Sequence, residues 1–120
     1  MDSSGIFETL KGVFRGAAKR LAVKKDTAFE YTLVTRTPSP FPQHKGHPLE
    51  FGSVKIGKAY VSFHLMPLYM VSEKISPELE KRMHGKSCFN FKTDPAPELV
   101  AELKQLTKAG LKQWDANKWI

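Results

Sequence analysis

The chain has 120 residues, of which 41% are hydrophobic and 26% are charged. This length suits one domain over residues 1–120 and is too short for two, and the composition excludes a chain that stays disordered for lack of apolar residues. The formal net charge of +7 favours anionic partners, although a basic surface without any partner would carry the same charge.

The N-terminal part of the sequence predicts a helix, a strand and a loop. Between Ser4 and about Val23, apolar residues recur at steps of three and four, which is the pattern of an amphipathic helix with a basic opposite side. Residues 28–35, including Phe29, alternate between apolar and polar types and predict a strand. Residues 36–48 contain four prolines and a glycine, so they predict an exposed, mobile loop.

A β-hairpin follows, because Gly57-Lys58 lies between two strand-like runs and suits a two-residue type II′ turn. Pairing outward from this turn places Ile56 opposite Ala59 and Val54 opposite Val61 on an apolar face. Directly paired residues share a face. The other face therefore carries Lys55 opposite Tyr60, Ser53 opposite Ser62, and Phe51 opposite His64.

The C-terminal part predicts two helices with a strand between them. Ser76-Pro77 resembles an N-cap followed by a first-turn proline and opens a short helix through Met83. Alternation over residues 86–92 predicts a strand that buries Phe89 and Phe91. Asp94-Pro95 begins a final helix, and its buried stripe comprises Leu99, Leu103, Leu106, Ala109 or Gly110, Leu111 and Trp114.

These elements predict an α+β fold in the order α-β-β-β-α-β-α. Its sheet is mostly antiparallel, has four strands and is covered on one face by the first and last helices. An open second face is compatible with this arrangement.

The cellular location follows from what the sequence lacks. No stretch approaches the roughly 20 apolar residues that cross a bilayer, and residues 1–5 show no basic region that leads into an apolar run. Cys88 is the single cysteine, so an internal disulfide is impossible and a reducing compartment fits best. We therefore predict a cytoplasmic protein without a membrane partner.

Short catalytic motifs are missing from the sequence. It has no phosphate-binding glycine loop, zinc-protease helix, nucleophile elbow or calcium loop. We therefore predict no catalytic residues and no cofactor, and we favour a protein that is not an enzyme. Acid–base groups distant in sequence could still meet in the fold.

Metal binding is one alternative. His84 and Cys88 have a His-x-x-x-Cys spacing that two ligands of a soft metal ion can share. His64 would be a third ligand if its strand lay beside residues 86–92. Otherwise Cys88 is a small packed side chain, and His84 is a cation at a helix end.

The predicted polar face of the sheet combines aromatic rings with cations. Such a mixture can stack bases and contact phosphates, although a solvated face with scattered aromatic residues is the alternative, and no RNP-type motif is present. The candidate ligand-binding residues are Phe51, Lys55, Tyr60, His64 and Lys86, with Lys92 on the same face.

Two runs, Lys58-Ala-Tyr-Val-Ser-Phe-His64 and Gly85-Lys-Ser-Cys-Phe-Asn-Phe91, resemble the YdhG-like family of small bacterial domains of unknown function. The likeness covers roughly the middle and C-terminal two thirds of the chain and implies a compact helix-and-sheet fold. Some members of that family are regarded as frataxin-like iron chaperones, which would imply a ridge of surface carboxylates. The first helix here has Glu8 as its one acid, so no metal-binding residue is carried over.

Three hypotheses therefore follow from the sequence. The leading one is a binding or adaptor domain that uses the polar sheet face around Tyr60 and His64. The second is a weak nucleic-acid binder that uses Lys55, Lys86 and the basic first helix. The third is a metal-handling protein, or a metal-dependent enzyme, with the ligands His64, His84 and Cys88.

Overall fold

A six-stranded antiparallel sheet forms the centre of the computed structural model, which describes residues 2–71 and 74–120. The strand order across the sheet is β1-β2-β3-β4-β6-β5. This arrangement confirms an α+β fold with an antiparallel sheet. The strands are β1 (Ala22–Asp26), β2 (Glu30–Pro38), β3 (Pro48–Ile56), β4 (Val61–Leu65), β5 (Met83–His84) and β6 (Cys88–Phe91).

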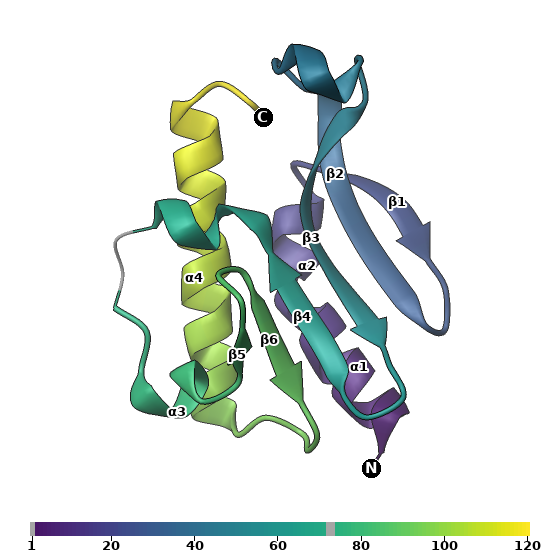
Figure 1. Cartoon of the computed structure of the whole chain (residues 1–120), viewed down its shortest axis with the longest axis vertical. Coiled ribbons are helices and arrows are strands. Elements are labelled where there is room, and N and C mark those ends of the chain that lie inside the picture. The colour runs from purple at the N-terminus through teal and green to yellow at the C-terminus, as the bar shows by residue number, and fades with distance from the viewer. Residues whose placement is uncertain (1, 72–73) are drawn as a thin grey trace.

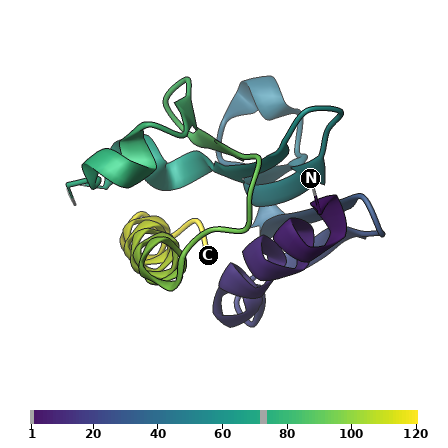
Figure 2. The same ribbon diagram turned by 90° about the horizontal axis from the view of Figure 1, so that it is seen from below.

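The two long helices lie on the same side of this sheet (Figures 1 and 2). They are α1 (Ser3–Val13) and α4 (Pro97–Ala116), and the shorter helices are α2 (Arg15–Ala18) and α3 (Pro77–Glu80). Two 3₁₀ turns, η1 (Pro42–His44) and η2 (Met66–Met70), complete the described elements. None of the helices in residues 2–71 and 74–120 is both long enough and apolar enough to cross a membrane.

The core lies between these helices and the sheet. As the periodicity predicts, α1 buries Ile6, Phe7 and Leu10, and α4 buries a stripe that includes Leu103 and Trp114. The sheet contributes apolar residues from its four central strands. Those with no exposed surface are Leu33, Phe51, Val54, Val61, Phe63, Leu65, Phe89 and Phe91, which confirms the burial predicted for the last strand.

The first helix is shorter than its apolar pattern predicts. It ends at Val13, a single turn of helix follows in α2, and residues 22–26 form β1 instead of continuing the helix to Val23. Lys24 and Lys25 are exposed on this edge strand, where charged residues discourage pairing with another chain. Phe29, predicted as part of the first strand, lies in the turn before β2 and is 70% exposed.

The central hairpin has a longer turn than Gly57-Lys58 predicts. Neither residue has the positive φ that a type II′ turn requires at its first central position. The loop instead spans Gly57 to Tyr60, and the Gly57 N–H donates to the Tyr60 carbonyl at 2.8 Å. Ile56 consequently pairs with Val61 and Ser53 with His64. The predicted register is wrong by two residues, but an even shift keeps residues 53–56 and 61–64 on their predicted faces.

Phe51 does not lie on the polar face, because the β2–β3 pairing is interrupted at this point. Leu33 pairs with Gly52 and the next residue of β2 pairs with Glu50, so Phe51 is the extra residue of a bulge. Its ring is fully buried, with its centroid 6.3 Å from that of Phe14. Gly52 makes this packing possible, since a Cβ there would lie 2.5 Å from Cζ of Phe14. Phe51 is therefore a core residue and not a ligand-binding one.

The C-terminal third also departs from prediction. Helix α3 ends at Glu80, and Met83 and His84 form the short edge strand β5 instead of a helix end. Gly85 has a φ of +76° in the turn that follows. Helix α4 begins at Pro97, two residues after Pro95, with Ala96 as its N-cap. The two extra edge strands and α2 change the predicted order to α-α-β-β-β-β-α-β-β-α.

Candidate functional site

A row of polar side chains crosses the sheet on the face turned away from α1 and α4. Each member is paired directly with the next, on neighbouring strands. From β2 to β5 the row reads Thr32, Ser53, His64, Cys88 and His84. A second row on the same face consists of Glu30, Lys55, Ser62 and Asn90. We call these two rows together the outer face.

Accessibility increases toward β5 along the first of these rows. Thr32 and Ser53 are only 2% exposed, whereas His64 and Cys88 are half-buried and His84 is exposed. Thr32 is also satisfied locally, because its hydroxyl donates to a carboxylate oxygen of Glu30 at 2.8 Å. In this row, a ligand would therefore contact mainly the residues of β4, β6 and β5.

The half-buried residues of the row are neutral near pH 7. Burial lowers the pKa of His64, and the charge of Lys55 adds to this effect while Glu50 opposes it. Burial also raises the pKa of the Cys88 thiol, against a smaller opposing effect of Lys55. A protonated thiol is a poor nucleophile and a poor metal ligand. The middle of the row therefore offers neutral hydrogen-bonding groups and no reactive thiolate.

The structure brings the three predicted metal ligands into one row but does not cluster them. His64 and His84 are the two neighbours of Cys88, on opposite sides of it. Among residues 2–71 and 74–120, no three His, Cys, Asp or Glu side chains are placed to hold one metal ion. The metal-handling hypothesis therefore gains no support from this geometry and stays a prediction.

The accessible end of the outer face adjoins a hollow of about 400 Å³. Its walls come from the hairpin turn before β4, the end of α3, β5 and the end of β6. We call it the edge hollow, and its lining residues are Ala59, Tyr60, Lys81, Arg82, Met83, His84, Asn90 and Lys92. Asn90 belongs to the second polar row, so the edge hollow and the outer face are continuous.

Arg82 in the edge hollow is stacked on a neighbouring ring. Its guanidinium carbon lies 5.4 Å from the ring centroid of Phe91, and its backbone carbonyl accepts a 2.8 Å hydrogen bond from the Asn90 N–H. Its Nε atom is buried and has no hydrogen-bond partner among the described residues. The side chain is thus positioned by stacking and retains an unused donor.

The predicted ligand-binding residues separate into distinct places. Tyr60 lines the edge hollow and is 37% exposed, and His64 and Lys55 lie on the outer face. Lys86 is exposed in the turn between β5 and β6 and does not line the hollow. Sequence reasoning missed Lys81 and Arg82, since it assigned both to a short helix and did not predict where that helix lies relative to Tyr60.

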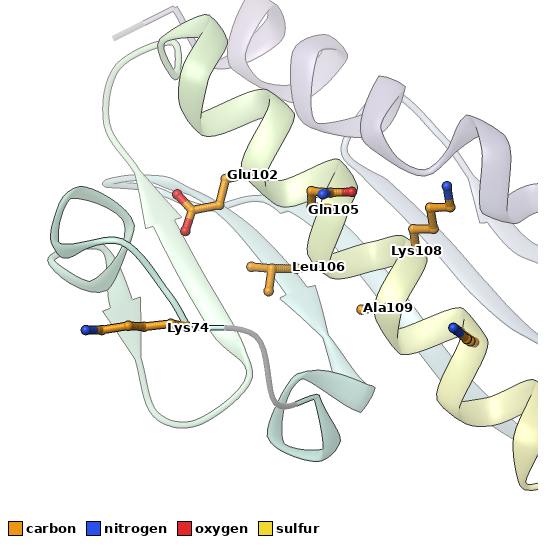
Figure 3. Close-up of a pocket in the computed structure, with 7 residues that line it drawn as sticks. Lys74, Glu102, Gln105, Leu106, Lys108 and Ala109 are labelled. Atoms are coloured by element: carbon orange, nitrogen blue, oxygen red, sulfur yellow. The ribbon is translucent and has the colours of Figure 1, made fainter.

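A second hollow is also lined by lysines, but their side chains do not point toward one place. It encloses about 440 Å³ against the outer side of α4 and is lined by Lys74, Lys108 and Lys112 among others. Figure 3 shows Lys74 and Lys108 pointing away from each other. The carboxylate of Glu102 is occupied, because it accepts hydrogen bonds from the Ser76 N–H at 2.7 Å and from the Ser76 hydroxyl at 2.6 Å. This contact attaches the residues before α3 to α4 and does not form an anion site.

Comparison of the chain with models of protein families, with curated proteins and with solved structures gave no match. The resemblance to the YdhG-like family therefore stays a prediction.

Proposed function

We propose that the chain is a binding domain, and not an enzyme, that takes a phosphate- or carboxylate-bearing ligand in the edge hollow. The observation that carries this proposal is the charge of the lining. Lys81, Arg82 and Lys92 are cations, and no described lining residue is acidic. Cations around one hollow concentrate anions there and hold them by charge-assisted hydrogen bonds.

The arrangement of Arg82 favours an oxyanion over a simple halide. A guanidinium presents its donors as a planar fork that matches two oxygens of a phosphate or carboxylate. Stacking on Phe91 limits the orientations of this fork before any ligand arrives. Less side-chain entropy is then lost on binding.

Single-stranded nucleic acid is the second candidate, and Tyr60 favours it. Its partly exposed ring lies in the same hollow as the cations, and an aromatic ring beside basic groups can stack a base while they contact the backbone. From Asn90, the second polar row leads through Ser62 to Lys55, which could contact a further phosphate. A strand could therefore extend from the edge hollow across the outer face.

Calorimetric titration with pyrophosphate tests the first candidate, and Lys92→Gln is the central variant. This change removes one charge from the edge hollow without removing a core contact, since Lys92 is exposed. Lys86→Gln is the matched control, because it removes the same charge from an exposed position outside the hollow. We expect Lys92→Gln to weaken pyrophosphate binding at least fivefold and Lys86→Gln to weaken it less than twofold.

Equal losses in the two variants would show that pyrophosphate responds to net charge alone, and the edge hollow would be rejected. The same titration with a ten-nucleotide oligothymidine, at low and moderate salt, tests the second candidate. Nucleic-acid binding predicts tighter association than with pyrophosphate, a steep loss with salt, and weakening by Tyr60→Ala. An oligothymidine affinity no higher than that of pyrophosphate would reject it.

A further inference from the structure

An apolar cavity lies at the other end of the molecule from the edge hollow. It encloses about 540 Å³, within the range of small-molecule sites in proteins. Its walls come from η1 and the residues around it, the start of β3, η2 and the end of α4. Figure 1 shows η1 and the C-terminus together at the top, far from the turn that precedes β4. We call this the aromatic cavity.

Its main walls are rings held at steep angles to one another. The centroids of Phe41 and Trp119 are 5.5 Å apart with an interplanar angle of 73°, and those of Trp119 and Trp114 are 5.6 Å apart at 76°. Met66 and Leu49 add aliphatic surface to the lining. Nearly perpendicular rings offer a third ring both a face and an edge, which are the two favoured contacts between aromatic groups.

The loop that carries Phe41 makes several hydrogen bonds within itself. The Ser39 hydroxyl contacts Nδ1 of His44 at 2.6 Å, and the Ser39 N–H donates to the His47 carbonyl at 3.0 Å. The Lys45 N–H donates to the Pro42 carbonyl at 3.0 Å. The cavity is consequently built before a ligand enters it, which reduces the ordering cost of binding.

Trp114, one of the residues that line the aromatic cavity, has an unsatisfied donor. Trp114 is only 2% exposed, and its indole Nε1 is buried without a hydrogen-bond partner among the described residues. An indole N–H can only donate, and a buried donor without an acceptor costs free energy. A ligand acceptor that reached this N–H would remove that cost. Lys45 at the rim adds a positive charge, and Glu50 is the one acid among the lining residues.

From these observations we infer a second binding site, independent of the edge hollow, for a planar aromatic small molecule that carries a hydrogen-bond acceptor such as a carboxylate. The rings of Phe41, Trp119 and Trp114 contact its aromatic part, and the Trp114 N–H donates to its acceptor. The ligand class follows from the lining residues. Apolar walls favour a flat apolar group, and an indole N–H without a partner favours a hydrogen-bond acceptor.

The test uses naphthalene-2-carboxylate as the probe and follows the indole N–H signals of the ¹⁵N-labelled full chain by NMR. The chain has two tryptophans, so only two such signals are present, and Trp119→Phe assigns them. We expect the Trp114 signal to move downfield in a saturable way as its N–H gains an acceptor. Phe41→Ala should weaken binding at least fivefold. Phe29→Ala, which truncates another exposed phenylalanine outside the cavity, should leave binding unchanged.

A Trp114 signal that does not move at millimolar probe would overturn the inference, and so would equal weakening by Phe41→Ala and Phe29→Ala. Arg82→Gln separates the two proposed sites, because it alters the edge hollow and leaves the aromatic cavity intact. If Arg82→Gln abolishes binding of the probe, its carboxylate is held in the edge hollow and the aromatic cavity is rejected. Unchanged binding in this variant supports the aromatic cavity whether or not pyrophosphate binds the protein.

Discussion

The two faces of the sheet differ in what their side chains contact. On the face toward α1 and α4, Phe63 stacks on Phe14 with ring centroids 4.7 Å apart and has no exposed surface. On the outer face, the neighbouring residues Ser62 and His64 are half-buried and belong to rows of polar groups. Alternate residues of one strand therefore serve two purposes. The covered face stabilises the fold, which leaves the outer face available for binding at little cost in stability.

The largest expected difference between the faces comes from truncating adjacent residues of β4. Phe63→Ala removes a fully buried ring and should lower the free energy of unfolding by about 3–5 kcal/mol. Ser62→Ala, one residue earlier, should change it by no more than about 0.5 kcal/mol. Urea unfolding followed by circular dichroism measures both. Similar losses of unfolding free energy in the two variants would contradict the conclusion that the covered face, and not the outer face, stabilises the fold.

A smaller effect is expected where the covered face has no room for a side chain. In Gly52→Ala the new Cβ would lie 2.5 Å from Cζ of Phe14 and 2.9 Å from the His64 carbonyl oxygen. Such overpacking should destabilise the protein by roughly 1–3 kcal/mol. Gly12→Ala in α1 is the control, since a Cβ there meets nothing within 4 Å. It should stabilise the protein by up to about 1 kcal/mol through helix propensity.

If thermal unfolding shows Gly52→Ala to be neutral, Phe14 does not pack against the sheet as described. The bulge at Phe51 would then need to be reconsidered, because the two features depend on the same glycine.

The smallest expected effect concerns pH and belongs to the outer face. Burial lowers the pKa of His64 in the folded protein relative to its ordinary value of 6.5. The unfolded chain therefore binds a proton more readily, and the contribution of this site to stability falls as the pH drops below about 6.5. His64→Gln should make the urea midpoint less dependent on pH between 7.5 and 5. An unchanged pH dependence in the variant would show that His64 is not buried as described.

Much of the covered face could be predicted from sequence, because the residues that build it repeat with a regular period. The helix stripes through Leu10 and Leu103 follow a period of 3.6, and Val54 and Phe63 follow the alternation of a strand. The two-residue error in the hairpin register did not change which face the paired residues of β3 and β4 were assigned to, since that alternation has a period of two. Phe51 was misplaced because a bulge breaks this period without a signal of its own in the sequence.

The edge strands and the candidate site were harder to predict. β1 is charged and β5 has only two residues, so neither shows a periodic pattern. The pairing of β5 with β6 is what brings Arg82 close to Tyr60 and Lys92. That juxtaposition depends on tertiary structure, and local spacing carries no sign of it. His64 was correctly placed on the polar face because strand alternation is local, whereas Tyr60 was predicted in a strand opposite Lys55 and lies in the turn before β4.

A map of amide chemical-shift changes on adding pyrophosphate to the unmodified protein is the sharpest test of the edge hollow as a binding site. We expect saturable changes that cluster at the edge hollow, at Tyr60, Arg82, His84, Asn90 and Lys92, with little change along α4 or at Lys86. Changes spread over exposed lysines throughout the chain, or confined to Lys74, Lys108 and Lys112 beside α4, would contradict this assignment.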